Sequence, residues 1–289
     1  MTSVRKAAPE PVRRAGRRAY LQVGTATAPL RLQPGFIMIG AQRCGTTSLF
    51  RALMAHPQVV RPAFHKGINF FDLNYYRGLT WYRGHFPVAR MAQAATARYG
   101  GPMTFEASGC YMYHPFAMER LARDLPRVKL VVMLRDPVER AFSAYKHEYA
   151  RGYEWESFER ALELEDERLI GEVDRMRGDP AYESFTHRHH SYTYRGHYAD
   201  QLERIFGLFP REQVHVMDSE AFFARPAHEY RELTDFLGLR SFQPASFGQH
   251  NARPGAPMAA GTQRMLEDHF APHNKRLAEL LDWAPQWPR

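Results

Sequence analysis

The chain is poor in cysteine, since its 289 residues include only Cys44 and Cys110. Two cysteines are too few for a disulfide framework, so we expect reduced thiols in a reducing compartment. The sequence also lacks an apolar run near the roughly 18 residues that a membrane span needs, and no apolar signal segment follows the arginines near its start. These absences predict a cytoplasmic protein without a transmembrane segment.

Internal repeats and low-complexity segments are lacking as well, and no linker divides the interior of the sequence. Hydrophobic residues make up 44% of the chain, which is enough to bury a sizeable core. We expect residues 34–289 to form a single domain and residues 1–33 to form a flexible basic tail that could contact a membrane surface. The basic residues crowded into this tail are Arg5, Lys6, Arg13, Arg14, Arg17 and Arg18.

The formal net charge is +8 at pH 7. Such an excess attracts anions, whether a nucleotide, an acidic glycan, a lipid headgroup or a nucleic acid, and does not choose among them. No nucleic-acid-binding motif accompanies the charge, so we expect no nucleic-acid partner.

Short apolar segments alternate with helical ones along the chain. Residues 36–39 and 128–134 are typical of buried strands, and each is followed by a turn and a helix. Further strands are expected at 103–106 and 213–217, and helices at 48–54, 114–124, 137–149, 158–176, 198–209, 229–237 and 262–281. The alternation predicts an α/β protein, a three-layer P-loop-like fold whose central, mostly parallel sheet is flanked by helices.

The turn after the first strand has the glycine spacing of a P-loop. It reads Gly40-Ala41-Gln42-Arg43-Cys44-Gly45-Thr46-Thr47, with Ser48 next. Thr46 stands where a P-loop of a nucleotide triphosphatase requires lysine, which disfavours ATP hydrolysis and kinase chemistry. A glycine turn that opens a helix still directs backbone N–H groups and the helix dipole at one spot, so it suits a tetrahedral anion.

Several segments resemble one family. Residues 40–49 resemble the 5'-phosphosulfate loop of sulfotransferases that use 3'-phosphoadenosine 5'-phosphosulfate (PAPS), and particularly the carbohydrate-type branch that includes heparan sulfate enzymes and bacterial relatives. Residues 134–145 are similar to the 3'-phosphate motif of that family, and residues 198–213 to its downstream helix and strand. The resemblance runs from about residue 36 to residue 281.

The resemblance implies that PAPS is the co-substrate and that no metal is required. Arg43 stands where the family usually has a catalytic lysine, and the resemblance assigns Arg135 and Ser143 to the 3'-phosphate. Arg253 falls where the family closes a basic loop over the nucleotide. The residues expected to bind PAPS are therefore Gly40, Gln42, Arg43, Cys44, Gly45, Thr46, Thr47, Ser48, Arg135, Ser143 and Arg253.

The expected general base is missing from its usual place. Relatives often have a glutamate after the lysine that corresponds to Lys66, but this chain has Gly67 there. A base is still needed because the acceptor must lose a proton. The candidates are His65, Asp72 and Glu106, and Glu106 is preferred because it ends a predicted strand that faces the cleft. Lys66 resembles the family lysine that points into the active site.

The sequence thus predicts a sulfotransferase that moves a sulfuryl group from PAPS to a hydroxyl or amine of a saccharide, glycolipid or small metabolite. The alternatives are a P-loop kinase and a non-catalytic module that binds adenosine 3',5'-bisphosphate or a sulfated glycan. The run His187-Arg188-His189-His190 lacks the spacing of a metal site, so we expect no metal there.

Overall fold

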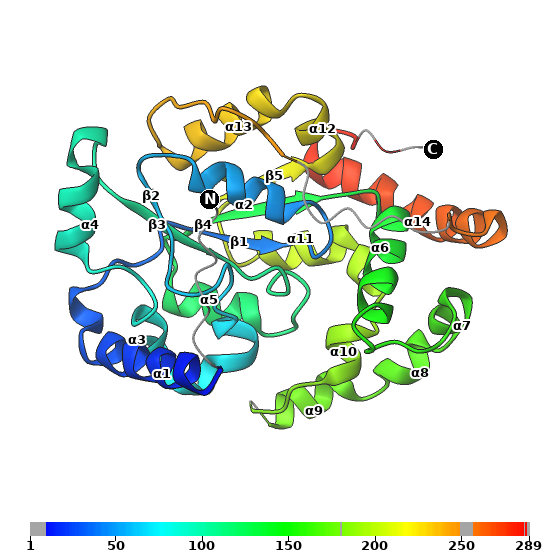
Figure 1. The fold of residues 1–289 in the computed structure, drawn as a ribbon. Coiled ribbons are helices and arrows are strands. Elements are labelled where there is room, and N and C mark those ends of the chain that lie inside the picture. The colour runs from blue at the N-terminus through cyan, green and yellow to red at the C-terminus, as the bar shows by residue number, and fades with distance from the viewer. Residues whose placement is uncertain (1–9, 180, 249–256, 286, 288–289) are drawn as a thin grey trace, which may run out of the picture.

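The computed structural model describes residues 10–179, 181–248, 257–285 and 287. A sheet of five strands lies between layers of helices (Figure 1). The strands are β1 (Phe36–Gly40), β2 (Val59–Val60), β3 (Met103–Ala107), β4 (Lys129–Leu134) and β5 (Val214–Asp218). Their pairings are parallel and their order is β2-β3-β1-β4-β5. The predicted α/β fold with a parallel sheet is confirmed.

β1 is the central strand and is buried along its whole length. Phe36 of β1 stacks on Phe105 of β3 with 4.6 Å between the ring centroids. Because β1 pairs with β3 on one side and with β4 on the other, the chain connections diverge at its carboxyl end. In parallel α/β sheets this divergence leaves a crevice in which ligands bind.

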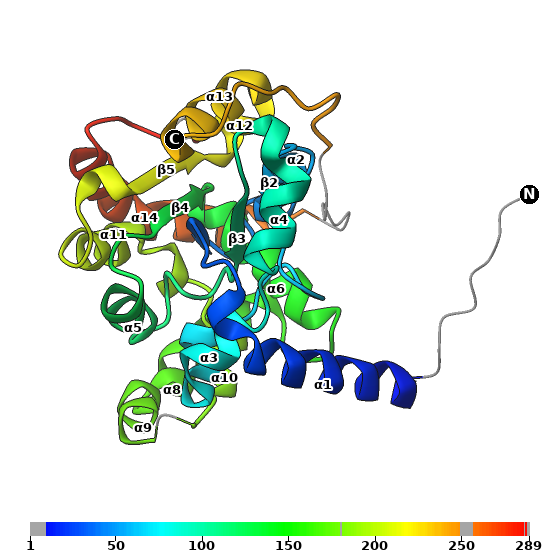
Figure 2. The same cartoon turned by 90° about the vertical axis from the view of Figure 1, so that its left-hand side faces the viewer.

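Helices cover both faces of the sheet. α2 (Thr46–Met54), α12 (Ser219–Ala224) and α13 (Pro226–Leu237) lie on one face, and α5 (Ala117–Asp124) and α11 (Tyr198–Phe206) lie on the other (Figures 1 and 2). α14 (Ala260–Leu281) packs against α11. The predicted three layers are therefore present, and the predicted helices differ from the observed ones mainly at their ends.

α6 (Pro137–Tyr149) leads from the sheet into a group of short helices. It begins at Asp136, whose carboxylate accepts a hydrogen bond of 2.9 Å from the Val138 N–H. The group contains α7 (Phe158–Glu163), α8 (Glu165–Leu169), α9 (Glu172–Gly178) and α10 (Phe185–His189), and a second, smaller apolar core lies among α6, α7 and α14. The single helix expected over 158–176 is wrong: the chain turns between α8 and α9 at Gly171, where φ is 73°.

The remaining elements are short. They are α3 (Gly78–Arg83), α4 (Ala89–Thr96), a π-helical turn η2 (Phe70–Asn74) and the 3₁₀ turns η1 (Ala28–Leu30), η3 (Tyr75–Arg77), η4 (Ala97–Tyr99), η5 (Tyr194–Gly196) and η6 (Arg211–Gln213). In the described part of the chain, no helix combines the length and the apolar character needed to cross a bilayer.

The segment expected to be a flexible tail forms α1 (Glu10–Ala26), which contacts α3, and the backbones of Gly24 and Gly84 touch where the two meet (Figure 2). Residues 11–20 of this helix are exposed, whereas Gly24 and Ala28 are buried. The Arg31 guanidinium donates a hydrogen bond of 2.7 Å to the Phe86 carbonyl. The segment is therefore anchored near its carboxyl end by residues far along the chain, which the local composition does not reveal, and the expected boundary between tail and domain stays a prediction.

Two glycines of α1 give a matched test of this packing. A Cβ at Gly24 would lie 2.4 Å from the Gly84 carbonyl oxygen, whereas a Cβ at Gly16 would meet nothing within 4 Å. Gly24→Ala should therefore lower the unfolding midpoint and speed tryptic cleavage after Arg17. Gly16→Ala should raise stability by up to about 1 kcal/mol, because alanine favours a helix. Identical behaviour of the two variants in thermal unfolding and proteolysis would contradict the packing.

Candidate active site

The anion-binding loop lies at the carboxyl end of β1, in the crevice where the chain connections diverge. It leaves β1 at Gly40 and enters α2 at Thr46, and the Ala41 N–H donates to the Met133 carbonyl of β4 at 2.8 Å. Gly45 has a φ of 84°, and a Cβ there would lie 3.1 Å from the Phe223 ring, so glycine is required. The first N–H groups of α2 have no partner within the helix and are available for an anion.

A lysine from another segment reaches the loop at Thr46, where a P-loop would have its own lysine. The Lys66 ammonium donates to the hydroxyls of Thr46 at 3.0 Å and Thr47 at 3.3 Å. Burial lowers the pKa of Lys66 to about 8, because the ammonium is taken out of water without a carboxylate beside it. Lys66 therefore lies beside the loop hydroxyls.

Arg43 connects the loop to the second anion-binding motif. Its Nε–H donates to the Ser143 hydroxyl on α6 at 3.1 Å, across 100 residues of sequence. Arg43 also has a φ of 73°, a left-handed conformation that is unusual for arginine. The two residues that the sequence assigned to opposite ends of one nucleotide are thus in contact.

A second connection passes through Cys44. Its buried thiol lies 3.6 Å from the Tyr198 hydroxyl, which donates to the Arg135 carbonyl at 2.9 Å. Burial raises the pKa of Cys44 to about 11, so the thiol is protonated at neutral pH and does not serve as a nucleophile. Cys44 is instead part of the link between the loop and the end of β4.

Arg135 stands at the carboxyl end of β4 between two carboxylates. Its guanidinium lies 3.1 Å from Glu139 and 3.7 Å from Glu220. Burial and the neighbouring Asp218 raise the pKa of Glu220 to about 7. Glu139 and Glu220 are therefore the ion-pair partners of the guanidinium that the sequence assigned to a phosphate. Glu220 was missed in the sequence because only the tertiary structure brings α12 beside this strand.

Gly67 has no room for the glutamate that relatives often carry. A Cβ at this position would lie 2.7 Å from the Ala107 carbonyl oxygen and 2.9 Å from the Ser108 hydroxyl. A backbone oxygen cannot move aside as a flexible side chain can. The departure from the family pattern is therefore built into the packing of this segment on the end of β3.

Glu106 is placed differently from what the sequence suggested. Its side chain is fully buried, and it accepts hydrogen bonds from the Ile68 N–H and from three hydroxyls, those of Tyr82, Ser108 and Tyr111. Burial raises its pKa, while these donors act in the opposite direction. Four donors therefore enclose the carboxylate and hold the Lys66 segment on β3, and the preference for Glu106 as the general base stays an untested prediction.

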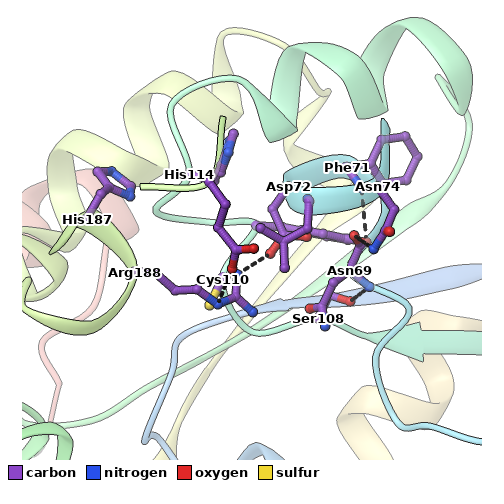
Figure 3. A network of polar contacts seen from close by, with 12 residues as sticks. Asn69, Phe71, Asp72, Asn74, Ser108, Cys110, His114, His187 and Arg188 are labelled. Carbon is purple, nitrogen blue, oxygen red and sulfur yellow. Dashed lines mark hydrogen bonds and ion pairs between the residues drawn. The ribbon is translucent and has the colours of Figure 1, made fainter. Parts of the chain in front are cut away.

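The other two base candidates differ in access. Asp72, on η2, faces Arg188 at 3.2 Å and borders a small cavity with Cys110, His114 and His187 (Figure 3). Burial raises the pKa of Asp72, and Arg188 opposes this change. His65 lies at the surface, and the partial loss of water around its ring and the charge of Arg17 lower its pKa. Asp72 thus combines a raised pKa with a position at the edge of a cavity.

The remaining predicted residues add little to this geometry. Gln42 is half-buried in the loop, and Ser48 is buried in the first turn of α2. Arg253 lies outside the described residues. Arg188, which was dismissed within its histidine run, belongs to the cavity, while His189 contacts Glu148 and His190 the Tyr153 carbonyl.

The four donors around Glu106 predict the result of one substitution. Glu106→Gln should lower the free energy of unfolding by about 1–3 kcal/mol, because the new amide N–H₂ would face a donor in a buried site. Urea unfolding is the measurement, with the exposed Glu163→Gln as the control. A Glu106→Gln protein with unchanged stability would contradict the structural role of this carboxylate.

Comparison with known proteins identifies the family of this chain. A family model described as "Sulfotransferase domain" matches residues 33–247. The bifunctional heparan sulfate N-deacetylase/N-sulfotransferase 2 of Bos taurus is 27% identical, over 89% of this chain and 31% of its own length. The membrane-associated sulfotransferase kil1 of Dictyostelium discoideum is 27% identical, over 88% of this chain and 66% of its own. The chain thus spans about a third of the first of these relatives.

A solved structure gives the same result. A sulfotransferase from Alicyclobacillus acidocaldarius is 29% identical and superposes with a TM-score of 0.64, covering 87% of this chain and 97% of that one. The family match extends from the segment before β1 to the residues after α13, so it includes the anion-binding loop, Lys66 and the Arg135 motif. The chain belongs to the sulfotransferase family.

Proposed function

We propose that this chain transfers the sulfuryl group of PAPS to a hydroxyl or amine of an acceptor. The observation that carries the proposal is the hydrogen bond between Arg43 and Ser143, because it joins the loop suited to the 5'-phosphosulfate with the motif suited to the 3'-phosphate. A nucleotide with phosphate groups at both ends needs two such anion sites at a fixed separation.

In this proposal the two ends of PAPS have separate partners. The first N–H groups of α2, the Thr46 and Thr47 hydroxyls and Lys66 hold the 5'-phosphosulfate. Ser143 and Arg135 hold the 3'-phosphate, which replaces Glu139 and Glu220 as the partner of Arg135. Arg253 is expected to close over the nucleotide. The cations supply the positive charge that a metal ion would otherwise provide, so we propose that no metal takes part in transfer.

The proposed reaction is an in-line displacement at sulfur. The acceptor atom forms a bond to sulfur as the bond from sulfur to the 5'-phosphate oxygen breaks, and adenosine 3',5'-bisphosphate leaves with the electron pair. Negative charge grows on the leaving oxygen, where Arg43 and Lys66 stabilise it. Arginine keeps its charge throughout, so Arg43 acts through its charge and not as a proton donor.

We propose Asp72 as the group that takes the acceptor's proton. Its support is the cavity that it borders with Arg188, together with burial that raises its pKa and makes it a better base (Figure 3). The acceptor is proposed to be a carbohydrate or a small metabolite, since the name of the bovine relative refers to heparan sulfate. The net charge of +8 agrees with an anionic acceptor.

A non-catalytic module that binds adenosine 3',5'-bisphosphate is the second candidate. The lack of space for a glutamate at Gly67 favours it, because the usual base cannot be accommodated there. It differs from the first candidate in one outcome, namely nucleotide binding without transfer to any acceptor.

A cytoplasmic location is also proposed. Its support is that Cys44 and Cys110 are free, which suits a reducing compartment. Contact of the basic N-terminal segment with an anionic membrane surface stays a prediction.

Incubation of the purified protein with sulfur-labelled PAPS and a panel of glycans, glycolipids and phenols tests the proposal. Arg43→Ala should lower kcat/KM by roughly 100–1,000-fold because it removes charge stabilisation from the transition state. Arg43→Lys, which restores the residue usual in the family, should retain more activity, and the exposed Arg90→Ala on α4 should match the unaltered protein. Equal transfer by Arg43→Ala would remove Arg43 from the mechanism.

The same assay tests Asp72 as the base and distinguishes an enzyme from a non-catalytic module. Asp72→Asn should lower kcat with nucleotide affinity unchanged if Asp72 is the base. Nucleotide binding without label on any acceptor, in the unaltered protein, would favour the non-catalytic module.

Lys66→Met should stabilise the nucleotide-free protein and weaken its binding of adenosine 3',5'-bisphosphate by at least about tenfold. The folded pKa near 8, against the usual 10.5, means that keeping Lys66 charged at neutral pH costs stability, on the order of 3 kcal/mol at most. The cost is fully present below pH 8 and disappears as the pH approaches 10.5, where lysine is neutral in both states.

Chemical unfolding across this pH range and calorimetric titration with the nucleotide are the measurements, with Lys275→Met, an exposed lysine of α14, as the control. A Lys66→Met protein that is less stable and binds the nucleotide normally would contradict the placement of Lys66 on the loop.

A further inference from the structure

Three histidines come together where α11 meets α14. His197 precedes α11, and His269 and His273 lie one turn apart on α14. The Nε2 atoms of His197 and His269 are 2.9 Å apart, and the rings of His197 and His273 are stacked with 3.9 Å between their centroids. One ring nitrogen from each histidine lies within 4.8 Å of those of the other two.

This spacing is close to that of a metal site. A tetrahedral zinc ion with bonds to nitrogen of about 2.0–2.1 Å places its ligand atoms roughly 3.4 Å apart. Binding of one ion by all three nitrogens requires the His273 ring to rotate out of its stack on His197. Two histidines at i and i+4 share one face of a helix and approach an ion from the same side. His269 is exposed, so water can reach the fourth position.

The contacts among the three rings also suit a metal, because neutral imidazole is the form that binds metal. The short contact between His197 and His269 needs one ring to carry a hydrogen toward the other, and an ion takes the place of that hydrogen.

We propose that His197, His269 and His273 bind a divalent transition metal ion, with zinc the best suited to three imidazoles and a water. The ion joins α11 to α14 and takes no part in sulfuryl transfer, because its ligands lie outside the loop and the Lys66 segment. The sequence alone did not indicate the group, since His197 is more than seventy residues from the other two.

The position of the ion connects it to the nucleotide site. Tyr198 follows His197 directly, and its hydroxyl holds the Arg135 carbonyl and contacts Cys44. Phe270, between the other two ligands, packs so tightly on Gly196 that a Cβ there would lie 2.6 Å from its ring. α14 lies beside both α11 and α6 (Figure 1). An ion that fixes α14 therefore also fixes the elements that carry Arg135 and Ser143.

Cobalt titration of the full chain, without a polyhistidine tag and after treatment with a chelator, tests the site. We expect one Co²⁺ per chain with the visible absorbance of a tetrahedral site, and zinc should displace it. His269→Gln and His273→Gln should each weaken binding by more than about tenfold. His228→Gln on α13 is the matched control, because its side chain is exposed and distant in sequence from the group.

Thermal unfolding supplies an independent measurement. Zinc chloride should raise the unfolding midpoint of the unaltered protein and of His228→Gln, and should leave His269→Gln unaffected. His269 is exposed, so its substitution is expected to leave the fold intact, which circular dichroism checks. Cobalt binding that is weak and non-stoichiometric, or that is the same in His269→Gln and His273→Gln as in the unaltered protein, would overturn the proposal.

Discussion

The hydrogen bond from Arg43 to Ser143 is the contact on which the site depends. It closes a loop of 100 residues and sets the separation between two anion-binding segments. Neither segment is specific by itself, since a glycine turn before a helix and an arginine at a strand end are both common in α/β proteins. The contact holds them together at the crevice beside β1, where ligands bind in parallel α/β sheets.

Buried charge gives the site its chemistry. Lys66 reaches the loop hydroxyls from a neighbouring segment and loses part of its basicity to burial, while Arg135 is shared between Glu139 and Glu220. Keeping Lys66 charged therefore costs stability, and an anion bound beside it offsets that cost by providing the opposite charge.

The segment from Lys66 to Asp72 explains the departure from the family pattern. Gly67 lies against the end of β3. At that junction the buried Glu106 accepts hydrogen bonds from the Ile68 N–H and from three hydroxyls. One carboxylate therefore anchors the segment on β3. Asp72, five residues after the glycine, lies at the edge of a small cavity with Arg188.

Local chemistry in the sequence determined four of the five strands, the longer helices around the sheet, the anion-binding loop and the motif around Arg135, because apolar periodicity, glycine spacing and helix capping act between near neighbours. Only the tertiary structure decided that Lys66 lies beside the loop hydroxyls, that Glu106 is enclosed, that α1 contacts α3 and that three histidines converge. These features depend on contacts across tens of residues or more, and which distant side chains meet is set by the packing of helices on the sheet, which no short stretch of sequence contains.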